Sequence, residues 1–103
     1  MDIQKLAKEL EFDEEDVAVL VEVFFESAKE SLSLLNSAIA TKNYQDIASY
    51  AHTIKGSSAN LMLEDVVEIA RQIELDARYC KDVDYVKRFS KLEQLIEELH
   101  ESK

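Results

Sequence analysis

The sequence predicts an all-α protein. It contains one glycine and no proline in 103 residues, so it has almost none of the residues that tight turns and β-bulges need. Its apolar residues recur at intervals of three and four positions, the spacing of one face of an α-helix. The length suits one hydrophobic core. We therefore expect a single domain over residues 1–103, an antiparallel up-down-up-down four-helix bundle with a short extra N-terminal helix.

Two helices are expected in the N-terminal part of the chain. The first covers about residues 2–10, and its narrow apolar stripe consists of Ile3, Leu6 and Leu10. The second follows Asp13, a good N-cap residue that stands before further acidic residues, and continues to about Thr41. Its apolar face is wide enough for the centre of a bundle and consists of Val17, Leu20, Val21, Phe24, Ala28, Leu32, Leu35 and Ile39.

Two central helices follow. Asn43 can cap the third helix from Tyr44 onward. Its apolar positions are Ile47, Tyr50, Ala51, Ile54, Ser58 and Leu61. The fourth helix begins near Leu63, and its apolar stripe is Leu63, Val66, Ala70, Ile73, Ala77 and Cys80. Because the helical neighbours of Cys80 are apolar, this cysteine is expected to be a small core residue.

The last helix begins after a short break, where Asp82 or Asp84 can serve as its cap. Its apolar positions are Val86, Phe89, Leu92, Ile96 and Leu99. All connections between the four long helices are short. Consecutive helices are therefore expected to run antiparallel.

The charge of the chain limits its partners. Twenty-two acidic and twelve basic residues give a formal net charge of −10, which repels nucleic-acid phosphates and anionic lipid surfaces. We expect neither nucleic-acid nor membrane binding. No apolar run approaches the roughly 18 residues that a membrane span requires, and the N-terminus lacks a basic, apolar signal sequence. A cytoplasmic location is expected.

His52 lies at the edge of the apolar stripe of the third helix, in a row with Ala48, Lys55, Gly56 and Ala59. Helical side chains lean toward the N-terminus, so the residue four positions on normally covers the preceding one. Gly56 leaves that space open beside His52, although glycine in a helix costs about 1 kcal/mol relative to alanine. An accessible neutral imidazole can accept a phosphoryl group, whose charge a nearby lysine would balance.

Ser57 stands beside this group, and its hydroxyl can donate a hydrogen bond either to a phosphoryl group or to a local backbone acceptor. On the fourth helix, Glu74 and Arg78 share a stripe with Val67 and Arg71 beside the core positions, on the side that faces the third helix. Arg78 would favour an incoming phosphoryl group or an acidic partner surface.

The segment "AHTIKGSSANLMLEDVVEIARQIE", residues 51–74, resembles the signature of histidine-containing phosphotransfer (HPt) domains. That signature is roughly Ala-His-x-Leu-Lys-Gly-x-Ser/Ala-x-x-Leu-Gly, followed by an amphipathic helix. The resemblance implies that His52 is phosphorylated on Nε2 and that Lys55 and Gly56 support and expose it. It also implies that Glu74 holds the other ring nitrogen, Nδ1. The four-helix bundle of that family agrees with the periodicity.

One residue departs from the signature, because Met62 stands where the family usually has glycine. Either Met62 takes a left-handed conformation at the end of the third helix, or the helix ends differently, with Asn60 as the tolerant residue. The thioether would enlarge an apolar docking patch beside His52. The expected partner surface consists of Ala48, Ala59, Met62 and Arg71.

The resemblance implies a phosphocarrier of a two-component phosphorelay, whose partners are response-regulator receiver domains, sensor histidine kinases or both. The receiver would supply Mg²⁺, so no cofactor and no metal site are expected in this chain. The sequence contains no glycine-rich phosphate loop and no Ser-His-Asp arrangement, which argues against an enzyme. A monomer is expected, and a free-standing relay protein and a domain of a larger kinase both remain open.

Two other classes of function have some support in the sequence. Glu97 and His100 have the Glu-x-x-His spacing of di-iron bundles, but such a site needs a second pair, and Ser49 stands three residues before His52. His100 is expected on a fraying terminal turn. The remaining alternative is a helical adaptor that binds signalling partners without being phosphorylated.

Overall fold

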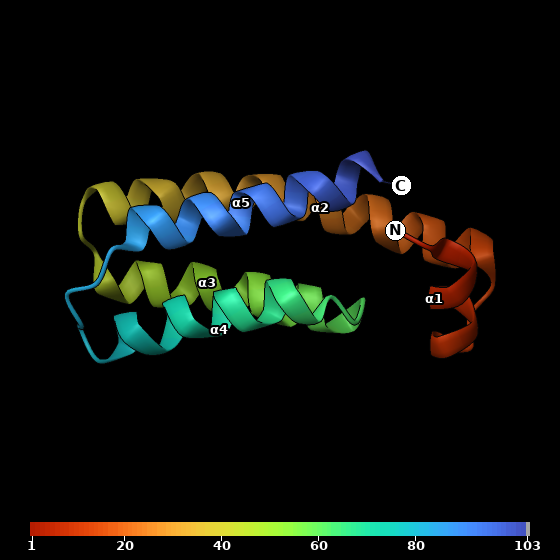
Figure 1. Cartoon of the computed structure of the whole chain (residues 1–103), viewed down its shortest axis with the longest axis horizontal. Coiled ribbons are helices and arrows are strands. Elements are labelled where there is room, and N and C mark those ends of the chain that lie inside the picture. The colour runs from red at the N-terminus through yellow and green to blue at the C-terminus, as the bar shows by residue number, and fades with distance from the viewer. Residues whose placement is uncertain (103) are drawn as a thin grey trace.

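The computed structural model describes residues 1–102, which form five α-helices and no strand. The helices are α1 (Ile3–Leu10), α2 (Glu14–Ala40), α3 (Tyr44–Asn60), α4 (Glu64–Arg78) and α5 (Tyr85–Glu101). Figure 1 shows α2 to α5 lying along the long axis of the molecule, with α1 across the N-terminal end of α2. The extents are 43 × 21 × 16 Å, so the molecule is elongated. The predicted all-α class is confirmed.

Short polar side chains set where several helices begin. Asn43 caps α3, because its side chain accepts a hydrogen bond from the backbone N–H three residues on, and Asp84 caps α5 in the same way. Asp84 rather than Asp82 is therefore the cap. Asp13 occupies the N-cap position of α2 without a side-chain cap bond, so three acidic residues in the first turn supply the favourable charge there.

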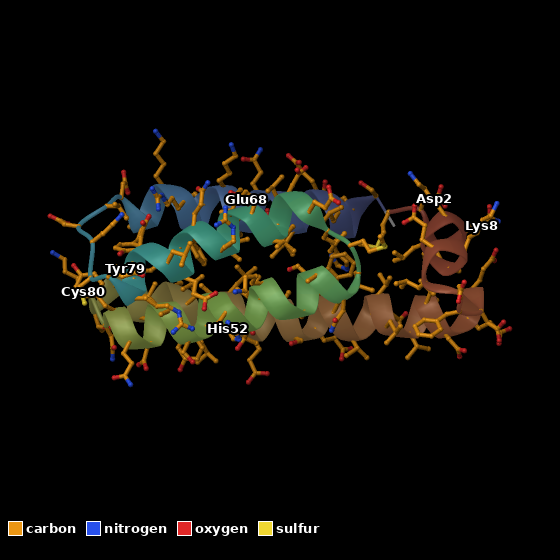
Figure 2. All side chains as sticks on the ribbon, turned by 90° about the horizontal axis from the view of Figure 1, so that it is seen from below. Asp2, Lys8, His52, Glu68, Tyr79 and Cys80 are labelled. Carbon is orange, nitrogen blue, oxygen red and sulfur yellow. The ribbon has the colours of Figure 1, made fainter. Side chains whose placement is uncertain are left out.

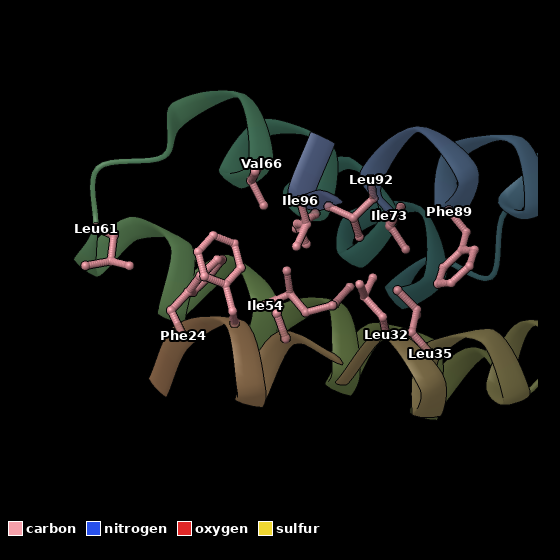
Figure 3. Close-up of a cluster of buried hydrophobic side chains, with 14 of the residues drawn as sticks. Phe24, Leu32, Leu35, Ile54, Leu61, Val66, Ile73, Phe89, Leu92 and Ile96 are labelled. Atoms are coloured by element: carbon pink, nitrogen blue, oxygen red, sulfur yellow. The ribbon is translucent and has the colours of Figure 1, made fainter. Parts of the chain in front are cut away.

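The core lies between α2, α3, α4 and α5. Helix α3 packs against both α2 and α4, and α5 contacts α2 and α4. Figure 3 shows side chains from these four helices converging. The large apolar side chains that are almost completely inaccessible to solvent are Val17, Val21, Leu35, Ile47, Ile54, Val66, Ile73 and Leu92. Each such side chain contributes roughly 1.5–3 kcal/mol of burial free energy, so this core holds the helices together.

Helix α1 adds to one end of this core. Its Leu6 and Ala7 are buried, and it packs on α2. The amino group of Met1 donates a hydrogen bond of 3.0 Å to the carbonyl oxygen of Ser102, which ties the start of the chain to the end of α5. Among residues 1–102, none of the helices combines the length and apolar character that crossing a membrane would require.

Three predicted core positions are wrong. Leu20 is 41% exposed on α2, and Val86 is 65% exposed on α5, where Tyr85 takes the buried place. The hydroxyl of the buried Tyr85 still has a hydrogen-bond partner, because it donates a hydrogen bond of 2.6 Å to the carbonyl oxygen of Lys81. Cys80 is exposed, since α4 ends at Arg78 and the chain turns away with Cys80 in a left-handed conformation at φ 52°.

Candidate functional site

His52 lies near the middle of α3, as Figure 2 shows, and its side chain is 59% exposed. Glu74 comes from α4, the helix packed most closely on α3, and its side chain is 4% exposed. Nδ1 of His52 lies 2.9 Å from Oε2 of Glu74. The structure therefore brings together an accessible imidazole and a buried carboxylate from residues 22 positions apart.

The carboxylate of Glu74 also binds two cations. The ammonium of Lys55 lies 2.7 Å from Oε1. Arg78 donates from Nε at 2.9 Å and from Nη2 at 2.6 Å, both to Oε2. Within residues 1–102, Oε1 accepts no directed hydrogen bond, so its contact with Lys55 is an ion pair. Four of the predicted site residues thus form one cluster on the α3–α4 face: His52, Lys55, Glu74 and Arg78.

Glu74 is ionised in this cluster. Burial raises the pKa of Glu74, but the ion pair with Lys55 and the hydrogen bonds from Arg78 and His52 outweigh burial and lower that pKa from 4.5 to about 2. An ionised carboxylate is only an acceptor, so Nδ1 of His52 must carry the proton of the 2.9 Å contact. In a neutral ring the lone pair is then on Nε2. The fixed tautomer leaves a nucleophilic nitrogen on an exposed side chain.

Gly56 leaves open space one turn beyond His52. A Cβ atom placed on Gly56 meets no atom within 4 Å, and Gly56 and Ala59 are both exposed. Ser57 is half-buried, and its hydroxyl donates a hydrogen bond of 3.2 Å to the carbonyl oxygen of Ile54. The Ser57 hydroxyl therefore bonds to a local backbone acceptor, which is the second of its two predicted roles.

A shallow groove of about 460 Å³ runs beside His52. Its lining includes Arg78 and Ala77 from α4, Ala48 from α3, and Cys80. Ala48 is 7% exposed and contributes to the groove lining, and its place on the partner surface stays a prediction. The position of Cys80 in this groove was missed, because helical periodicity placed it on the core stripe of α4.

Met62 takes the left-handed conformation, with φ 59°, and its side chain is 49% exposed. Asn60 remains the last residue of α3, and the N–H of Met62 donates to the carbonyl oxygen of Ala59 at 3.0 Å. The first of the two alternatives for this helix end is therefore the observed one. Arg71 is exposed and pairs with Glu68 at 2.6 Å, so it lies outside the Glu74 cluster.

The second histidine lies elsewhere. The ring of His100 is 4.6 Å from the ring of Phe25, centroid to centroid, and belongs to the last turn of α5. Residues 1–102 contain no group of three or more histidine, cysteine, aspartate or glutamate side chains arranged to hold a metal ion.

The fold and the site define a helical module with one surface histidine whose ring is oriented by a buried carboxylate. The family model of the Hpt domain matches residues 19–102, and the chain belongs to this family. Hpt domains act in phosphorelays as histidine phosphocarrier modules without catalytic activity of their own, and they interact with kinases and response regulators. The match begins within α2 and leaves α1 outside. Searches of curated proteins and of solved structures gave no significant match.

Proposed function

We propose that His52 is the phosphoacceptor of this Hpt domain and that it exchanges its phosphoryl group with the aspartate of receiver domains. The observation that carries the proposal is the contact of 2.9 Å between Nδ1 and the ionised Glu74, which leaves Nε2 as the free nucleophile on an exposed ring. The open space at Gly56 supports it, because the active-site loops of a receiver need close approach to the imidazole.

The transfer proceeds by attack of the Nε2 lone pair on the phosphorus of an aspartyl phosphate. The bond between phosphorus and the aspartate oxygen breaks, and the carboxylate leaves with the electron pair. The ring keeps its Nδ1 proton and becomes positively charged while the new bond forms. Glu74 accepts the hydrogen bond of that proton and stabilises the charge, so it assists phosphorylation without touching the phosphoryl group.

Residues 1–103 act as one domain and one phosphocarrier, and α2 to α5 form an up-down-up-down bundle. Mg²⁺ is supplied by the receiver, so the chain needs no cofactor of its own. The protein works as a monomer in the cytoplasm, and a receiver or a sensor kinase docks over Gly56, Ala59 and Met62. Exposure of all three residues favours this surface.

Intact-mass measurement after treatment with phosphoramidate tests the proposal. Wild type is expected to gain one acid-labile phosphoryl group, and His52→Gln is expected to gain none. The matched control is His100→Gln, which removes the histidine of α5 and should be phosphorylated like wild type. A folded wild type that gains no phosphoryl group would favour the alternative, an adaptor that binds partners without phosphorylation.

A further inference from the structure

The two oxygens of the Glu74 carboxylate have different partners and different numbers of contacts. Oε2 accepts from Nδ1 of His52 at 2.9 Å and from two nitrogens of Arg78 at 2.9 and 2.6 Å. Oε1 has the Lys55 ammonium at 2.7 Å and, within residues 1–102, no directed hydrogen bond. Removal of one cation therefore has a different consequence at each oxygen.

Release of Lys55 would leave Oε1 without a partner in a residue that is only 3% exposed. A buried oxygen of an ionised carboxylate that is left without a partner costs its full desolvation penalty, even though Arg78 still binds the other oxygen. Release of Arg78 leaves Oε2 still bonded to His52, and Lys55 still neutralises the carboxylate. Arg78 is also the more exposed cation, at 54% against 30% for Lys55. Release of Arg78 from the carboxylate therefore costs less free energy than release of Lys55.

The groove beside His52 also favours Arg78 as the cation that moves. Arg78 lines this groove together with His52, whereas Lys55 does not. A phosphoryl group on Nε2 lies on the edge of the ring away from Nδ1, so a cation that now binds Glu74 must turn to reach it. The guanidinium offers several N–H donors in a planar fork that matches phosphate oxygens.

We infer that Arg78 is the cation that turns to the phosphoryl group on His52, and that Lys55 stays on Glu74 as the anchor of the buried carboxylate. The inference rests on the proposed function, because it assigns the roles of two residues at the same phosphoacceptor. In this chain the lysine of the His-x-x-Lys-Gly motif acts through Glu74, and the phosphoryl-binding residue comes from α4.

Three methionine variants separate the roles: Lys55→Met, Arg78→Met and Lys81→Met. Methionine keeps the apolar stem and removes the charge. Lys81 is the matched control, because it is an exposed cation near the end of α4 whose ion pair, at 3.9 Å, is with Asp76 instead of Glu74. The first measurement is the thermal midpoint of the unphosphorylated proteins. Lys55→Met is expected to unfold about 5–10 °C below Arg78→Met. Equal midpoints, or the reverse order, would overturn the anchor role of Lys55.

The second measurement is the half-life of phosphohistidine at neutral pH after phosphoramidate treatment. In this hydrolysis a water oxygen bonds to phosphorus, the N–P bond breaks, and Nε2 keeps the electron pair. Arg78→Met is expected to shorten the half-life by about threefold, as suits loss of a solvent-exposed ion pair. Lys55→Met, measured where it is fully folded, should change the half-life by less than about twofold, and Lys81→Met should match wild type.

A half-life shortened by Lys55→Met as much as by Arg78→Met would overturn the assignment of the phosphoryl group to Arg78. Absence of phosphorylation in wild type is a different result. It would refute the proposed function, and the thermal midpoints would still decide whether Lys55 anchors Glu74.

Discussion

Replacement of Gly56 by alanine should stabilise the protein. Gly56 lies in the interior of α3, has no positive φ, and a Cβ atom there meets nothing within 4 Å. The substitution therefore introduces no clash and removes the backbone entropy that glycine loses in a helix, which gives about 1 kcal/mol. For a domain of this size the thermal midpoint should rise by roughly 4–8 °C.

Thermal and urea unfolding of wild type and Gly56→Ala measure this gain. Ala59→Gly is the matched control, because Ala59 is exposed on the same helix and the change is reversed. Because Ala59 is the last residue but one of α3, its loss should be smaller than the helix-interior value of about 1 kcal/mol. If Ala59→Gly shows that loss and Gly56→Ala shows no gain, the reasoning that Gly56 sacrifices stability is refuted.

A larger substitution at Gly56 tests whether access to His52 explains the lower helix stability of glycine. Gly56→Gln should also fold, since the space around Gly56 is open, yet the long side chain would stand over the His52 ring. Transfer from a phosphorylated receiver domain should be slower than in Gly56→Ala, while phosphorylation by the small donor phosphoramidate should change less. Equal transfer rates at equal folded fraction would contradict the steric explanation.

Three more outcomes are expected. Met62→Gly should raise the free energy of unfolding in urea by about 1 kcal/mol, because Met62 has φ 59°, and a loss of stability would contradict a strained helix end. The pKa of Glu74 is lowered from 4.5 to about 2, so its contribution is complete above pH 4.5 and is lost as the pH falls toward 2. Wild type should therefore lose up to about 3 kcal/mol relative to Glu74→Gln over that pH range, measured by acid-dependent urea unfolding, and a constant difference would contradict the ionised cluster. Leu35→Ala, at a position with 0% exposure, should cost about 2–5 kcal/mol in the same assay, whereas a cost below 1 kcal/mol would mean that the core collapses around the gap.

Local chemistry made much of the fold predictable from the sequence. The cap residues Asn43 and Asp84 fix where α3 and α5 begin, and both signals are contained within four residues. The apolar rhythm of α2 and α3 identifies most of the core, because one face of each helix must be buried. The histidine motif likewise lies within a single helix, so its accessibility could be inferred from His52 and Gly56 alone.

The misses arose where packing decides between neighbouring positions. Tyr85 and Val86 are adjacent and both apolar, and only the rotation of α5 against the other helices buries the first and exposes the second. Cys80 follows the period of α4, but the helix has already ended. For Met62, the sequence allows two ways of ending α3, because either one satisfies the backbone hydrogen bonds at the helix end.

The sequence also could not predict which oxygen of Glu74 each of its partners binds. Spacing placed Lys55 beside His52 and Arg78 one turn after Glu74, which suggested two cations near a phosphoryl group. Which oxygen each cation binds depends on the distance between α3 and α4 and on side-chain conformations. Sequence periodicity contains neither.

The exposed thiol of Cys80 makes this protein convenient to observe. It is the only cysteine in the chain, and it lines the same groove as His52. A maleimide fluorophore would therefore attach to wild type at one defined place, without prior mutagenesis to remove competing thiols. Its emission would respond when another molecule covers the groove and excludes water from the dye. The native sequence thus already contains the attachment point for a sensor of docking at His52.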